Sequence, residues 1–108
     1  MSSYERKTPV KSDCPMEKTL HLISGKWKPA ILSELLRTNT IRLKDIQHGL
    51  PEASKRALTK QLNEMIEDNL IQKKDFNEFP KRTEYSITPL GSNLSTVFSE
   101  LDKFGRQL

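Results

Sequence analysis

Charged side chains between residues 54 and 68 follow an order that is unusual for a helix. Three bases come first and three acids follow: Lys55, Arg56 and Lys60, then Glu64, Glu67 and Asp68. A helix dipole favours the reverse order, because the N-terminus of a helix is its positive end. Each exposed charge at the wrong end costs about 0.3–1 kcal/mol. The pattern therefore indicates that a negatively charged partner meets the N-terminal half of this segment.

The chemistry that these bases suit best is contact with the major groove of DNA. If Leu58, Leu62 and Met65 face inward, the basic side chains lie on the outward side of the helix. An arginine pairs with guanine through two hydrogen bonds, a threonine methyl contacts thymine, and a lysine reaches phosphates. The candidate DNA-binding residues here are Ser54, Lys55, Arg56, Thr59 and Lys60. The alternative is an ordinary solvated helix face.

A second basic cluster is predicted on a hairpin that follows this helix. The apolar period changes from about 3.6 residues to about 2, which predicts strands over 70–76 and 82–88 joined by a loop at 77–81. Cations on such a wing release counterions from the DNA backbone. The candidates are Lys73, Lys74, Lys81 and Arg82. Lysines on exposed strands also prevent edge-to-edge aggregation, and this reading stays open.

The C-terminal segment carries an apolar seam with alternating spacings of four and three residues. Its members are Leu90, Leu94, Val97, Leu101, Phe104 and Leu108, with Phe98 beside them. A helix over 89–108 can bury this stripe on its own core, but it is long for so small a domain. We expect it to pack, together with a helix over 14–24, in a two-fold homodimer. The predicted interface residues are Met16, Leu20, Leu94, Val97, Phe98, Leu101, Phe104 and Leu108.

Cys14 is the only cysteine, and it falls at the predicted N-terminus of the first helix. The positive end of a helix dipole stabilises a thiolate, which is the reactive form of the side chain. Cys14 is therefore a candidate sensor of oxidants or electrophiles. The alternative is a small side chain buried under the first turn. A disulfide within the chain is impossible, because a second cysteine is lacking.

Size and composition narrow the class of protein. With 108 residues, of which 34% are hydrophobic, the chain is long enough for one small domain. We expect residues 1–13 to form a flexible tail and residues 14–108 to form the domain. The net charge of +4 is consistent with a polyanionic partner. No apolar run approaches the about 20 residues of a membrane span, so we expect a cytoplasmic protein that does not bind membranes.

The remaining candidates for chemistry are few. His21, His48 and Cys14 are too scattered to suggest a metal site, and no phosphate loop or nucleophile motif is present. We therefore expect no cofactor, no metal and no enzymatic activity. Trp27 is expected to anchor the core at the start of the second helix, although it can also line a small-molecule pocket at the dimer interface. The wing lacks the aromatic stacking platform with which proteins bind single-stranded RNA, so an RNA partner is less expected.

Together these segments predict a mainly α (α+β) fold. Two helices joined by a short turn, then a two-stranded wing and a long C-terminal dimerisation helix, form the layout of a winged helix-turn-helix. Similar modules also bind proteins, so a winged-helix interaction module without sequence-specific DNA binding is the alternative function. The order of charges along 54–68 favours double-stranded DNA as the partner.

Several short motifs occur along the chain in a specific order. They are Cys14-Pro15, Gly25-Lys26-Trp27-Lys28-Pro29 with Ile31-Leu32, the run 54–62, Asp68-Asn69-Leu70-Ile71, and 80–82 leading into 84–91. Through them the chain resembles the HxlR-type transcription regulators, which are similar to the MarR-like winged helices. The resemblance implies a homodimer that binds palindromic operator DNA. It places the DNA-reading helix at 54–68, the wing at 70–88, and the dimer contacts on the N-terminal and C-terminal helices.

The same resemblance bears on regulation. Some members of the family sense electrophiles or oxidants through the cysteine before the proline, which is Cys14 here. This chain departs from the members that have several cysteines, since it has one. The resemblance therefore implies a possible small-molecule inducer without indicating its identity.

Overall fold

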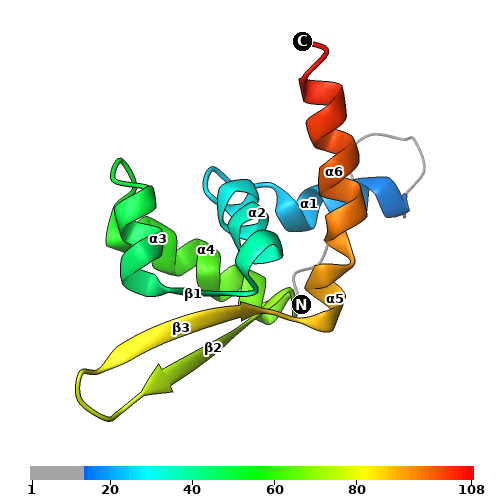
Figure 1. The fold of residues 1–108 in the computed structure, drawn as a ribbon. Helices are drawn as coiled ribbons and strands as arrows, with labels where there is room; N and C mark the ends of the chain where they lie inside the picture. The colour runs from blue at the N-terminus through cyan, green and yellow to red at the C-terminus, as the bar shows by residue number, and fades with distance from the viewer. Residues whose placement is uncertain (1–13) are drawn as a thin grey trace.

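A computed structural model describes residues 14–108, and the predicted flexible tail over residues 1–13 lies outside the described residues. The elements follow one another as α1 (Pro15–Ile23), α2 (Lys28–Thr38), β1 (Thr40–Arg42), α3 (Leu43–Gly49), α4 (Lys55–Glu67), β2 (Ile71–Phe76), β3 (Arg82–Ile87), α5 (Pro89–Ser92) and α6 (Leu94–Gly105). In this order α3 and α4 form a helix-turn-helix, and β2 and β3 form the wing (Figure 1). The predicted winged helix-turn-helix fold is confirmed.

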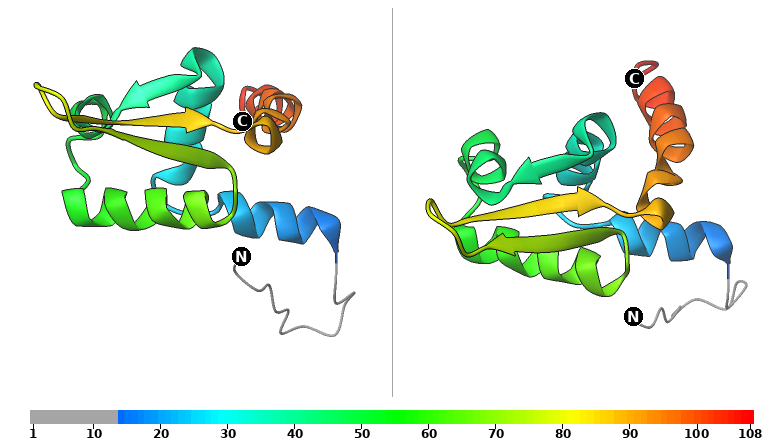
Figure 2. Two further views of the ribbon diagram at one scale, coloured as in Figure 1. Left: turned by 90° about the horizontal axis from the view of Figure 1, so that it is seen from below. Right: turned by 60° about the horizontal axis from the view of Figure 1, so that its bottom comes forward.

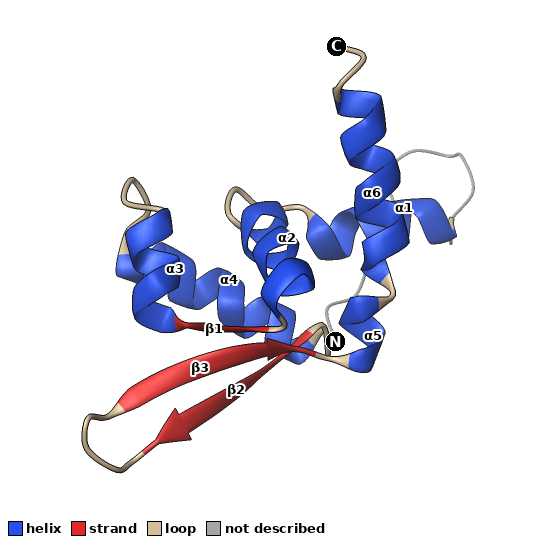
Figure 3. Cartoon of the chain, viewed as in Figure 1, coloured by secondary structure: helices blue, strands red, loops and turns tan. Residues whose placement is uncertain are grey.

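The strands form one antiparallel sheet in the order β1-β3-β2. Tyr85 of β3 pairs with Ile41 of β1 on one side and with Lys73 of β2 on the other. Helices α2, α3 and α4 pack along this sheet, and the hairpin of β2 and β3 extends beyond them (Figure 3). The two predicted wing strands are therefore present, with bounds that differ from the prediction by one residue at most.

The hydrophobic core lies between the helices and the sheet. Leu58, Leu62 and Met65 of α4 are fully buried there, as their spacing predicts. Trp27 is also buried, which confirms its predicted place in the core. Its backbone N–H donates a hydrogen bond to Oε1 of Gln61 at 2.8 Å, so the start of α2 is tied to the middle of α4.

Both ends of α4 are capped by residues next to them in the sequence. At its N-terminus, Oγ of Ser54 accepts a hydrogen bond from the Ala57 N–H at 3.0 Å. At its C-terminus, Asn69 adopts a left-handed conformation with φ 61°, and the Leu70 N–H donates to the Met65 carbonyl at 2.9 Å. Both ends of the predicted DNA-reading helix are therefore determined by residues adjacent to it in sequence.

The long C-terminal helix is present, but it is interrupted at Asn93, between α5 and α6. Its base is attached through Thr88, whose buried hydroxyl accepts from the Gly91 N–H at 2.9 Å and donates to the Asn69 carbonyl at 2.7 Å. Gly91 lies so close to this junction that an added Cβ would stand 2.2 Å from the Leu70 carbonyl oxygen. From there α6 extends away from the sheet (Figure 2).

Candidate nucleic-acid interface

The N-terminal half of α4 presents its bases to solvent. Lys55, Arg56 and Lys60 are exposed, and none of them forms an ion pair with another described residue. The first turn of α4 contains no acidic side chain. Thr59, which was predicted to accompany them, is half-buried, and the hydroxyl of Ser54 is used in capping the helix. Two cations in the first turn of α4 and one a turn further on are thus held without a charge partner among the described residues.

One acid in the C-terminal half of α4 has a structural role that the sequence pattern did not reveal. Glu64 lies 3.0 Å from Nζ of Lys28, which is almost completely buried at the start of α2. A buried ammonium group without a counter-charge is costly, so Glu64 stabilises the contact between α2 and α4. The reversed order of charges therefore has two parts. Glu64 has a partner within the domain, whereas the bases at the start of α4 have none among the described residues.

On the wing, the predicted cations occupy two faces. Successive side chains of a strand point to opposite sides, and Lys73 is paired with the buried Tyr85 whereas Lys74 is paired with Glu84. Nζ of Lys73 lies 3.8 Å from Oδ2 of Asp75 on one face. On the other face, Nζ of Lys74 lies 4.9 Å from the centre of the Phe76 ring. The two neighbouring lysines therefore cannot contact the same stretch of a flat surface.

Arg82 is the most constrained of the predicted wing cations. Its Nε donates a hydrogen bond to Oε2 of Glu84 at 2.9 Å, and its guanidinium lies 3.9 Å from the centre of the Phe76 ring. Arg42 on β1 approaches the same Glu84 oxygen at 3.9 Å. Lys81, by contrast, is exposed and forms no ion pair with a described residue. The hairpin thus holds one arginine in a defined orientation beside a lysine that is open to solvent.

A basic groove lies between α3 and β3, and the sequence pattern indicated only some of its residues. The groove has a volume of about 230 Å³ and is lined by Arg42, Leu43, Lys44, Gln47, Lys81, Arg82 and Thr83. Arg42 and Lys44 were missed. The two cations stand close together in the sequence, which was a signal for a basic site. They become neighbours of Lys81 only because β1 pairs with β3. We call this group the basic groove.

The basic regions gather at one end of the molecule. The start of α4, helix α3 and the tip of the hairpin all lie at the left of Figure 1, whereas α1, α5 and α6 lie at the right. The view from below shows the same separation (Figure 2). The predicted DNA-binding residues and the basic groove are therefore close enough in space to face one extended partner.

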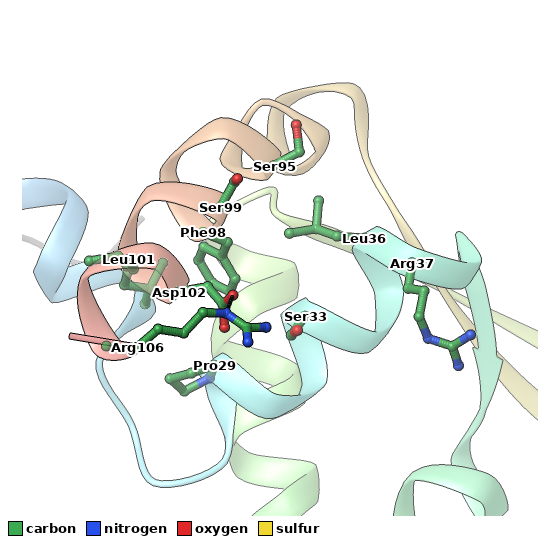
Figure 4. Close-up of a pocket in the computed structure, with 12 residues that line it drawn as sticks. Pro29, Ser33, Leu36, Arg37, Ser95, Phe98, Ser99, Leu101, Asp102 and Arg106 are labelled. Atoms are coloured by element: carbon green, nitrogen blue, oxygen red, sulfur yellow. Dashed lines mark hydrogen bonds and ion pairs between the residues drawn. The ribbon is translucent and has the colours of Figure 1, made fainter. Parts of the chain in front are cut away.

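The predicted dimer residues divide into two groups. Leu94 and Phe98 are half-buried against the domain's own core. The others are exposed, from 37% for Val97 to 93% for Leu108, and they comprise Met16, Leu20, Val97, Leu101, Phe104 and Leu108. Between α2 and α6 runs an open groove of about 980 Å³, into which the Phe98 ring projects (Figure 4). The seam is thus only partly buried by the domain itself.

Cys14 stands directly before α1 and is half-buried. Its carbonyl accepts a hydrogen bond from the Lys18 N–H at 3.0 Å, whereas its side chain makes no capping hydrogen bond. Within residues 14–108, no group of three or more His, Cys, Asp or Glu side chains is placed to hold a metal ion. No helix in this part of the chain is both long and apolar enough to cross a bilayer.

These features define a winged helix-turn-helix protein with a basic end and an apolar end. The family model for HxlR-like helix-turn-helix proteins matches residues 22–108. A protein of Fusobacterium mortiferum named as the regulatory protein MalR is 36% identical over 107 residues, which cover 99% of each chain. The chain therefore belongs to the HxlR-like helix-turn-helix family of transcriptional regulators.

Solved structures agree with this placement. The redox regulator HypR in its reduced form matches with a TM-score of 0.81 and 28% identity, over 87% of this chain and 92% of HypR. Its oxidised form matches with a TM-score of 0.78. The reduced form of the transcriptional regulator YodB from Bacillus subtilis matches with a TM-score of 0.75 and 26% identity, over 89% of this chain and 94% of YodB.

Proposed function

We propose that this transcriptional regulator acts as a homodimer that binds palindromic duplex DNA, with α4 of each subunit in a major groove. The observation that carries the proposal is the group of exposed bases at the start of α4, namely Lys55, Arg56 and Lys60, which have no charge partner among the described residues. Phosphate oxygens would supply the missing negative charge, and the helix dipole would add to the attraction.

Within this proposal the residues have different roles. Arg56 reads a base through its guanidinium, while Lys55 and Lys60 contact phosphates on either side of the groove. Thr59 is half-buried, so it reaches DNA only through the part of its side chain that remains exposed. On the wing, Lys81 and the basic groove contact the adjoining backbone, and Arg82 is oriented there by Glu84 and Phe76. Lys73 and Lys74 lie on opposite faces of the hairpin, so each contacts a different stretch of the DNA backbone.

The homodimer is supported by the apolar side chains that α1 and α6 leave exposed. Leu101 and Phe104 are 49% and 61% exposed on α6, and Met16 is 64% exposed on α1. Covering such a surface removes apolar area from water, at about 25 cal/mol per Å². We therefore propose that residues 14–108 form one domain, in which the segments 14–24 and 89–108 also form the dimer interface.

We also propose that Cys14 regulates this dimer. HypR is described as a redox regulator and is known in a reduced and an oxidised form. In this chain Cys14 is half-buried at the start of α1, within the proposed interface. Oxidation would join it to Cys14 of the partner subunit or to a small thiol, and an electrophile would add to its thiolate. Either change would alter the distance between the two α4 helices.

The test of DNA binding uses the full chain and a randomised duplex library. A duplex that the wild-type chain selects is then titrated in mobility-shift assays with Arg56→Ala and with the control Arg37→Ala. Arg37 is also exposed, but it pairs with Glu34 on α2. We expect Arg56→Ala to lose about 1–3 kcal/mol of binding and to relax the preference at one base pair per half-site.

Other outcomes would contradict the proposal. If the wild-type chain selects no sequence, the winged-helix protein-interaction module becomes the better interpretation. If both arginine variants bind as wild type does, the surface has been assigned wrongly. For Cys14, treatment with diamide should lower the affinity of the wild-type chain and leave Cys14→Ser unchanged. Full affinity of a wild-type chain whose thiol is shown by mass spectrometry to be modified would exclude Cys14 as the switch.

A further inference from the structure

The tip of the wing carries an aromatic side chain that does not pack against the described part of the domain. Phe79 is 98% exposed, in the loop between β2 and β3. The other phenylalanine of the hairpin, Phe76, is half-buried and its ring is covered by Arg82 and Lys74. The exposure of Phe79 is therefore not a general property of aromatic residues in this hairpin. Its side chain is free to contact another molecule.

The surroundings of Phe79 restrict the chemistry of that partner. Lys81 follows it at two residues and is exposed, Arg82 begins β3, and Lys74 lies two residues before the end of β2, whereas one exposed acid, Glu78, directly precedes Phe79. An apolar protein pocket would have to accept these cations at its rim. A DNA groove offers what the tip requires, because phosphates line its edges and the apolar faces of bases become accessible when a base-pair step opens.

We propose that Phe79 enters the minor groove of the DNA and wedges against a base-pair step. The inference rests on the proposed function, in which α4 occupies the major groove. The tip of the wing lies at the same end of the molecule as the start of α4 (Figure 1). On B-form DNA the groove next to a major groove is the minor groove, which is about 6 Å wide and admits a side chain but not a helix.

This geometry also predicts a sequence preference. A ring entering the minor groove is obstructed by the amino group of guanine, which A·T pairs lack. Pyrimidine–purine steps such as TA open most easily when an apolar side chain is inserted between them. Phe79 therefore favours an A·T-rich flank containing such a step, at positions beyond the base pairs that α4 reads.

The experiment compares Phe79→Ala, Phe79→Leu and the control Asn77→Ala, an exposed residue of the same loop, on a duplex selected by the wild-type chain. We expect Phe79→Ala to bind about tenfold more weakly, because part of an apolar side chain is no longer removed from water. Phe79→Leu should retain most of the affinity, since leucine also serves as a wedge. Asn77→Ala should bind as wild type does.

Two further measurements separate the wedge from a charge contact. Phe79→Ala should leave the salt dependence of binding unchanged, whereas Lys81→Ala should lower its slope by about 0.9. Replacing flanking G·C pairs by I·C pairs removes the minor-groove amino group and leaves the major groove intact. This replacement should strengthen binding by the wild-type chain more than binding by Phe79→Ala.

The proposal fails if Phe79→Ala binds the selected duplex as tightly as wild type while Arg56→Ala does not. That result would leave the proposed function standing and would assign Phe79 to a protein partner instead. Equal effects of inosine on the wild-type chain and Phe79→Ala would also overturn the wedge. If neither Arg56→Ala nor Phe79→Ala weakens binding, the proposed function itself fails.

Discussion

The two ends of the molecule expose surfaces of different chemistry. At one end Lys55, Arg56 and Lys60 stand without charge partners among the described residues, and at the other end Leu101 and Phe104 of α6 face outward. An exposed lysine or arginine is well hydrated, so the basic end is stable before DNA arrives. An exposed leucine or phenylalanine gains free energy whenever it is covered. Under the proposed function, the apolar end would have a permanent partner and the basic end a temporary one.

A charge placed in the apolar end should have the largest effect. We expect Leu101→Glu to cost several kcal/mol of association, because a carboxylate would have to be buried in the interface. DNA binding should be lost together with dimerisation, since two half-sites require two reading helices. Thr96→Glu, an exposed position of the same helix outside the seam, is the control. Sedimentation that finds a folded wild-type monomer at micromolar concentration would refute the division into permanent and temporary partners.

The junction between the two ends should be the next most sensitive position. In Gly91→Ala the new Cβ would stand 2.2 Å from the Leu70 carbonyl oxygen, so α5 or β2 must move. We expect a loss of about 1–3 kcal/mol in the free energy of unfolding. Gly105→Ala is a matched control, because a Cβ added at Gly105 would meet nothing within 4 Å among the described residues. Urea denaturation measures the free energy of unfolding of both variants. Equal stability would show that the backbone around Gly91 adjusts to the added methyl group without cost.

Single cations at the basic end should have a smaller effect that depends on salt. Lys44→Ala removes one cation of the basic groove, and we expect it to lower the slope of log affinity against log salt by about 0.9. Lys103→Ala removes a lysine at the other end, where Nζ lies 3.4 Å from Oε1 of Glu100. It should leave the slope unchanged. A change of slope in both variants would mean that DNA contacts more than one end of the protein.

The smallest expected effect concerns the core that joins the two ends. Burial of Tyr85 raises the pKa of its hydroxyl above the ordinary 10.0, and the nearby charge of Asp75 adds to the rise. The folded state therefore favours the protonated phenol. Its contribution to stability is complete below pH 10.0 and is lost as the pH rises through the folded-state pKa. The free energy of unfolding, measured between pH 9 and pH 11, should fall more steeply with pH for wild type than for Tyr85→Phe. The difference in slope should correspond to about one proton at most.

Much of the fold could be predicted from local patterns. Ser54 and Asn69 mark the ends of α4, and the change of period after residue 70 marks the wing, because caps and strand alternation depend on neighbours in sequence. The interruption at Asn93 could not be predicted, since the seam runs through it without a change of spacing. The same holds for the Lys28–Glu64 pair, which joins two helices distant in sequence.

The winged helix-turn-helix, the bases at the start of α4 and the apolar seam could all be predicted from the sequence, because each depends on residue types at helical or strand spacing. Which charges are paired within the domain became clear from the packing of its elements. Packing placed Glu64 against a buried lysine and brought Arg42 and Lys44 beside Lys81 through the pairing of β1 with β3. It also half-buried Leu94 and Phe98 while leaving Leu101 exposed. The physical reason is that ion pairs and burial depend on which elements pack together, and this packing joins residues that no local pattern relates.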